Sequence, residues 1–143
     1  MSARKPSNSL HPALIPSYQQ MIEKSFEGVW AVDVDFRVTY VNQRLCEMLG
    51  YSEKELLGKE VSAFMFAEDA NDQRERLENR RALRSEQYER RFRTKKNGEI
   101  WMLVTANPLL DDNGKFAGSF SYLTDKTKKK RFDRSLLILT ETQ

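Results

Sequence analysis

The chain has 143 residues, enough for one domain with a hydrophobic core, and its net charge is only +3. Hydrophobic residues make up 39% and charged residues 31%, as in ordinary globular proteins. The single cysteine excludes an internal disulfide framework, and we find neither a signal peptide nor an apolar run near the roughly 20 residues of a membrane helix. We therefore expect a cytoplasmic domain without membrane contact by this segment.

Two segments precede the first predicted strand. Residues 1–16 contain three of the chain's four prolines and no hydrophobic period, so we interpret them as a flexible leader. Residues 17–26 predict a short amphipathic helix, because their large apolar side chains recur at helical spacing. These side chains are Tyr18, Met21, Ile22 and Phe26.

The next segments predict strands and then helices. Residues 28–42, GVWAVDVDFRVTYVN, predict two strands joined by a tight turn at the aspartates. Asn42 then caps a helix that Gly50 closes, and Ser52 with Glu55 has the spacing of a capping box. Residues 68–84 alternate carboxylates with arginines, which predicts a solvated helix with pairs at i, i+4.

The second half of the chain changes to long strands. QYERRFRTKK, EIWMLVTANPLL and KFAGSFSYLTD are predicted strands, joined by hairpins at Asn97-Gly98 and Asn113-Gly114. From Lys126 the pattern is helical again. Two strands, short helices, three strands and a final helix predict an α+β fold, an antiparallel sheet with helices on one face.

Strand 99–110 has almost no polar face. Trp101 and Leu103 point to one side, and Met102, Val104 and Ala106 point to the other. Both faces of the sheet are therefore expected to be covered, one by the central helices and the other by the N-terminal helix or a second subunit.

Several motifs in this order resemble the PAS (Per-Arnt-Sim) family. Residues 28–58 match its pattern at Asn42, Gly50-Tyr51-Ser52, Glu55-Leu56 and Gly58. RFRTKKNGEIWM resembles the hairpin that follows in the family, and Asp125-Lys126-Thr127 resembles its closing Asp-Ile-Thr. One departure is Phe36, which stands where the family often has glycine.

The resemblance implies a five-stranded antiparallel sheet curled around a pocket that short helices roof. It implies a sensory or dimerisation module, residues 17–127, followed by a linker helix, residues 128–143, that leads to an effector such as a histidine kinase or a cyclic-nucleotide enzyme. The side chains expected to face the pocket are Trp30, Val32, Phe92, Met102, Val104, Ala106, Ser121 and Leu123. Those expected on the outer face, where a homodimer would form, are Met21, Ile22, Trp101, Leu103, Phe120 and Tyr122.

The residue types present exclude several kinds of site. We find no catalytic constellation and no metal cluster, because the only histidine, His11, lies in the leader. Cys46 is interpreted as a core thiol, and no cysteine follows it where the light-sensing branch of the family binds flavin. No histidine stands where the haem-binding branch has one. We therefore expect neither flavin nor haem.

Two questions stay open at this point. The predicted pocket is mostly apolar, so it is either a filled core, in a ligand-free scaffold for protein pairing, or a site for a small apolar ligand. The basic run KTKKKR is interpreted as the solvated start of the linker helix, and no nucleic-acid partner is expected.

The last residues predict how a change in the sheet could leave the domain. Asp125 is expected to cap the linker helix by accepting a hydrogen bond from Thr127 or Lys128. Phe132, Leu136 and Leu139 then form a short apolar seam that suits pairing with a second copy.

Overall fold

The computed structural model describes residues 17–141, so the predicted leader and the last two residues lie outside the described residues. The elements follow in the order α1 (Tyr18–Glu23), β1 (Gly28–Val32), β2 (Val38–Val41), α2 (Gln43–Leu49), α3 (Glu53–Leu56), η2 (Val61–Phe64), η3 (Ala67–Asp69), α4 (Ala70–Arg81), β3 (Glu86–Arg93), β4 (Glu99–Leu110), β5 (Phe116–Asp125) and α5 (Thr127–Glu141).

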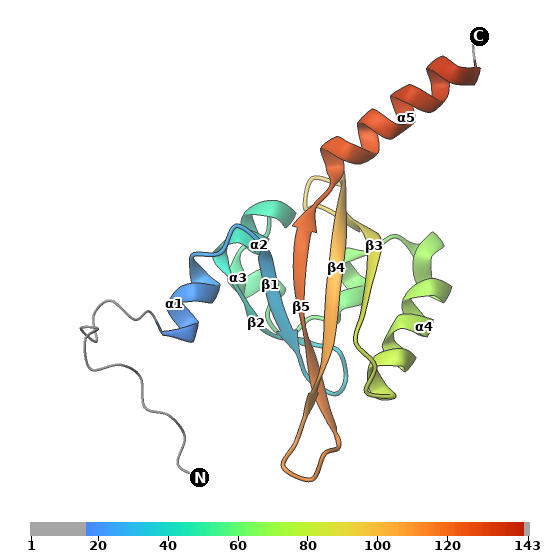
Figure 1. The fold of residues 1–143 in the computed structure, drawn as a ribbon. Coiled ribbons are helices and arrows are strands. Elements are labelled where there is room, and N and C mark those ends of the chain that lie inside the picture. The colour runs from blue at the N-terminus through green and yellow to red at the C-terminus, as the bar shows by residue number, and fades with distance from the viewer. Residues whose placement is uncertain (1–16, 142–143) are drawn as a thin grey trace, which may run out of the picture.

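The five strands form one antiparallel sheet in the order β2-β1-β5-β4-β3. The helices between β2 and β3 lie against one face of this sheet, and α5 projects away from it (Figure 1). This is the predicted α+β architecture. No helix in residues 17–141 is both long and apolar enough to cross a membrane.

A single hydrophobic core lies between the sheet and these helices. All eight side chains predicted to face inward are buried there, and Trp30 packs edge-on against Phe92 with ring centroids 5.8 Å apart. On β4 the side chains alternate between the two faces as predicted: Met102 is fully buried on the inner face, whereas Trp101 on the outer face is half-buried, so the outer face is covered only in part.

The three turns that join consecutive strands use the left-handed backbone region. At the hairpins one residue of each Asn-Gly pair adopts it, Asn97 at φ 63° in the first and Gly114 at φ 75° in the second. Phe36 adopts φ 59°, which is unusual for a bulky residue. Its ring is buried against Phe116, with centroids 5.8 Å apart, and this burial offsets the backbone strain.

Two predicted helix boundaries were wrong. The N-terminal helix ends at Glu23, and Phe26 lies beyond it with 93% of its surface exposed. The last helix begins at Thr127, one residue later than predicted, because the amide of Lys126 still pairs with the Trp101 carbonyl of β4 at 2.7 Å.

Asn42 joins three elements through its side chain. It is fully buried, and its oxygen accepts hydrogen bonds of 3.0 Å from the amides of Val29 in β1 and Leu45 in α2. Its amide nitrogen donates to the carbonyls of Ile22 and Glu27 at 2.9 and 3.0 Å. The residue predicted to be only a helix cap therefore also fixes α1 and the start of β1.

Replacing Asn42 by alanine should lower the free energy of unfolding by about 3 kcal/mol, because two amides and two carbonyls lose their buried partner. Urea denaturation measures this loss. Asn71→Ala, at an exposed position on α4, is the control and should change stability by less than about 0.5 kcal/mol. Equal losses in the two variants would contradict the assigned role of Asn42.

Candidate functional site

The predicted pocket is a small, partly open cavity in the core, with a volume of about 30 Å³. Six of the eight predicted residues line it; Met102 and Leu123 are fully buried outside its lining. The six are Trp30, Val32, Phe92, Val104, Ala106 and Ser121. A space of this size holds one or two water molecules.

The lining of this cavity also includes polar side chains that the sequence did not indicate. Gln73 and Arg80 of α4, Tyr88 of β3 and Ser119 of β5 line it beside Ser121. Both α4 residues are buried, since Arg80 is 2% exposed and Gln73 is 6% exposed. The pocket is therefore not uniformly apolar, and its polar groups come mainly from a helix predicted to be solvated.

The prediction that α4 is a solvated helix holds for its outward side but not for the side that faces the sheet. Gln73, Leu77 and Arg80 follow the i, i+4, i+7 spacing of one helix face, and they face the cavity. The arginines of α4 also reach β3, the next element of the chain, through Glu86. Spacing within α4 could not indicate partners on another element.

Five residues form what we call the α4–β3 charge network, in which Glu86 is the central carboxylate. It pairs with Arg80 at 2.8 Å and with Arg76 at 2.9 Å. Asp72 pairs with the buried guanidinium of Arg90 and lies 3.5 Å from Arg76. These contacts connect α4 with the edge strand of the sheet.

The network shifts the acid–base properties of its members. Burial acts to raise the pKa of Glu86, but the hydrogen bonds from Arg80 and Arg76 outweigh it and hold the pKa below its ordinary value. Burial raises the pKa of Tyr88, whose ring lies 4.3 Å from the guanidinium carbon of Arg76. Tyr88 is therefore protonated at neutral pH, and Glu86 is ionised.

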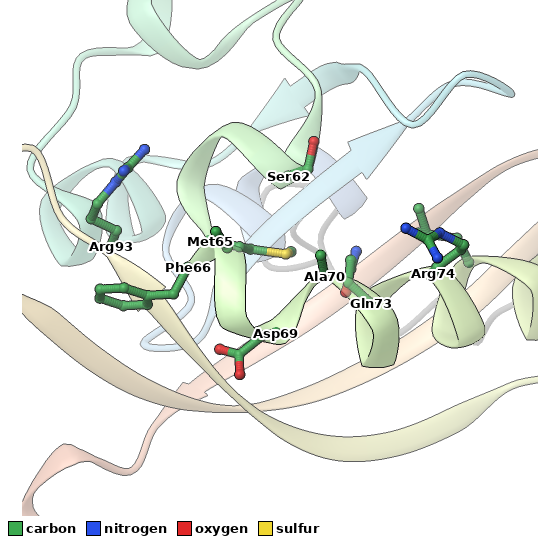
Figure 2. A pocket seen from close by; sticks show the side chains of 10 residues that line it. Ser62, Met65, Phe66, Asp69, Ala70, Gln73, Arg74 and Arg93 are labelled. Atoms are coloured by element: carbon green, nitrogen blue, oxygen red, sulfur yellow. The ribbon is translucent and has the colours of Figure 1, made fainter.

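A groove of about 520 Å³ lies outside the cavity, between η2, η3 and α4. Met65 points toward α4, where Gln73 lies, while Phe66 and Arg93 stand at the other end (Figure 2). Met65, Gln73 and Leu77 line both the groove and the interior cavity. These three side chains are the wall between the two spaces.

The outer face of the sheet has two different halves. Beside α1, an apolar groove of about 540 Å³ includes Ile22, Phe120 and Tyr122 in its lining, and Met21 next to Ile22 is 55% exposed. Leu103 is half-buried on β4. The predicted outer-face residues therefore share one side of the sheet but do not form one uniform patch.

Trp101, on the other half, is covered by the first turns of α5. Lys130 lies with its ammonium nitrogen 4.7 Å from the ring centroid, and the Arg134 guanidinium carbon lies at 5.9 Å. Lys130 also pairs with Glu89, and Arg134 pairs with Glu99 at 3.1 Å. Part of the basic run is thus bound to the sheet, and the prediction that this run is simply solvated was wrong for Lys130.

The junction between β5 and α5 has the hydrogen bond expected at Asp125. Its carboxylate accepts from the amide of Thr127 at 2.9 Å. The Thr127 hydroxyl in turn accepts from the amide of Trp101 in β4 at 3.1 Å. The first residue of α5 is therefore tied to two neighbouring strands.

Within residues 17–141 we find few side chains that could bind a metal ion or act as a nucleophile. No group of three or more His, Cys, Asp or Glu side chains there could hold a metal ion. Cys46 is buried, and burial raises the pKa of its thiol, so it is a core residue with low reactivity. The arrangement suits binding and transmission of conformational change.

The comparisons agree on the family and the fold. The family model described as PAS fold matches residues 17–125. PAS domains from Haloarcula marismortui (an HTR-like protein) and Colwellia psychrerythraea superpose with TM-scores of 0.63 and 0.69, at 24% and 18% identity. The matches cover 73% and 77% of this chain and 85% and 94% of those chains, which shows the fold.

Two curated relatives are sensor proteins. The C4-dicarboxylate transport sensor protein DctS of Rhodobacter capsulatus is 29% identical over 124 residues, covering 82% of this chain and 19% of that protein. The two-component sensor PprA of Pseudomonas aeruginosa is 28% identical over 120 residues, covering 83% and 13%. The chain therefore spans less than a fifth of either relative.

The depressed pKa of Glu86 makes part of the stability dependent on pH. A carboxylate with a lowered folded-state pKa stabilises the protein above its ordinary value of 4.5, and this contribution is lost as the pH falls through the folded-state pKa. Urea denaturation at pH 6 and pH 3 should therefore show a smaller difference in Glu86→Gln than in the wild type. At pH 6 the variant should be less stable by about 2 kcal/mol. An unchanged pH dependence would contradict the assignment.

Proposed function

The chain belongs to the PAS family, and from this membership we propose that it is a sensory and pairing module that passes a change in its sheet to α5. It is a PAS sensor module related to domains of sensor histidine kinases. The finer proposal is that it regulates and does not itself catalyse. We propose a cytoplasmic location, with no nucleic-acid or membrane partner.

The contact that carries this proposal is the junction of β4, β5 and α5. Asp125 accepts a hydrogen bond from the amide of Thr127, and the Thr127 hydroxyl accepts one from the amide of Trp101. A change in the relative position of the two strands must therefore alter these bonds or rotate the start of α5. That dependence makes α5 suited to transmit a change in the sheet.

The proposed output is a histidine kinase that follows α5 in a longer protein. Both curated relatives are sensors, and each extends well beyond the region that this chain matches. The apolar side chains of α5, including Phe132 and Leu136, are exposed at 64% and 50%. Such a helix suits pairing with its copy and continuation into an effector.

We propose a homodimer that forms on the α1 half of the outer face. The apolar groove there is flanked by exposed residues of the N-terminal segment, since Tyr18 is 86% and Phe26 is 93% exposed. Phe120 and Tyr122 add an edge-to-face aromatic pair with centroids 5.9 Å apart. A second copy would cover an apolar surface that monomers rarely leave open.

A second candidate function is a ligand-free scaffold for protein pairing. The interior cavity of about 30 Å³ favours it, because a drug-sized ligand needs several hundred cubic ångströms. A sensor that binds a small, mostly apolar molecule needs the core to open. Neither version of the proposal includes flavin or haem.

The dimer proposal predicts that Tyr122→Glu shifts the protein toward the monomer, because a carboxylate would be buried in the apolar interface. Analytical ultracentrifugation should show an increase of about tenfold or more in the dimer dissociation constant. Val34→Glu, at an exposed turn position, is the matched control and should remain dimeric. If the wild type is a monomer at high concentration, this interface does not exist.

The transmission proposal predicts that Asp125→Ala changes output in the longer protein that contains this chain. Loss of one cap should cost about 1 kcal/mol of stability, so the fold should survive. Autophosphorylation, compared with and without the stimulus, should lose most of its regulation. Asp133→Ala, within α5, is the control. Normal regulation in Asp125→Ala despite a lower melting temperature would leave the hydrogen bond with a structural role alone.

A further inference from the structure

Helix α4 covers the interior with little apolar contact of its own. Its inward face presents Leu77 between two polar residues, Gln73 and Arg80. Much of its hold on the sheet comes from the α4–β3 charge network, in which the Asp72 side chain is 48% exposed and that of Arg76 is 28% exposed, while that of Arg80 is only 3% exposed. Ion pairs that reach solvent are weakened by salt and contribute less than buried apolar contacts.

The same helix separates the two spaces of the molecule. Gln73 and Leu77 of α4, together with Met65, line both the outer groove of about 520 Å³ and the interior cavity of about 30 Å³. Met65, directly after η2, points toward the part of α4 that carries Gln73 (Figure 2). A small outward movement of α4 would therefore join the groove to the cavity.

Gln73 carries an unused hydrogen-bonding group at this wall. The side chain is 6% exposed, and within residues 17–141 its amide oxygen has no hydrogen-bond partner. A buried polar atom without a partner costs free energy, which a donor placed beside it would recover. The neighbouring cavity wall is aromatic, formed by Trp30, Tyr88 and Phe92.

We propose that α4 is a cover held by charge, and that its release opens the cavity to a small aromatic molecule that donates a hydrogen bond to Gln73. This inference rests on the sensory half of the proposed function, since it names the kind of ligand and its route. Leu77 is the main apolar contact that must part, whereas the partly exposed pair of Asp72 and Arg76 can exchange its partners for water and salt. The bound molecule would hold α4 in the released position.

Release of the cover can be tested without any ligand. In a Trp101→Phe background Trp30 is the only tryptophan, and it is 4% exposed in the cavity wall. Quenching of its fluorescence by acrylamide should rise roughly two- to fivefold in Glu86→Gln, the change expected from losing a partly exposed ion pair. Glu75→Gln, an exposed carboxylate on the same helix, should leave quenching unchanged.

Sodium chloride at about 1 M should also raise quenching in the unsubstituted Glu86 protein, by less than the substitution does, because salt screens the partly exposed pairs more than the buried pair of Arg80. This measurement does not depend on whether a Glu86 variant folds. Hydrogen exchange should quicken in α4 and stay slow in α2, which distinguishes local opening from general unfolding. Quenching that is insensitive to both salt and Glu86→Gln overturns the charge-held cover.

Two probes of the same shape test the role of Gln73. Indole has an N–H donor, and benzothiophene has sulfur in its place. Titrations followed by amide chemical shifts of α4 and β3 should show indole binding about tenfold more tightly. Gln73→Leu should remove this difference while leaving benzothiophene binding unchanged. Equal affinities in the wild type, or no binding of either probe, overturn the assignment of Gln73.

These results are separate from those that test the proposed function. If the cover stays closed and neither probe binds, Asp125→Ala can still abolish regulation, and the module would then transmit a change that arises elsewhere. If the probes bind as expected but Asp125→Ala regulates normally, the ligand site stands and transmission through Asp125 does not.

Discussion

Charge pairs between α4 and β3 hold in place the longest helix on the inner face of the sheet. A covering helix ordinarily buries an apolar stripe, but α4 turns inward one leucine flanked by Gln73 and Arg80. A buried guanidinium without a partner is strongly unfavourable, so Arg80 requires Glu86 of β3. The cavity has a polar lining where α4 packs, because Arg80 both fastens this helix to β3 and lines the cavity.

The two terminal helices are fastened to the sheet by different chemistry. Asn42 ties the end of α1 to β1 and α2 through four hydrogen bonds in a fully buried place. At the other end, the ring of Trp101 holds the first turns of α5 through its contact with Lys130, and Thr127 links these turns to β4. The outer face is therefore divided. Its α1 half remains apolar and open, while its α5 half is already occupied.

Features set by neighbours in sequence were predictable. The strand 99–110 has the predicted limits, because its flanking Asn-Gly turns and its apolar run are local properties. The capping box of Ser52 and Glu55 formed for the same reason. Phe36 was the local exception. The strain of its left-handed backbone is offset by packing on Phe116, a residue far along the chain.

By itself the sequence determined the element order and the fold class, because periodicity and turn chemistry act over a few residues, and its resemblance to the family indicated which side chains face inward. Only the tertiary structure decided that Arg80 and Arg90 are buried, that Gln73 faces the cavity, and that Trp101 is covered by α5. An arginine in solvent and an arginine paired inside the fold have the same local sequence pattern. What separates them is a carboxylate on another element, and its distance is set only when helix and strand pack together.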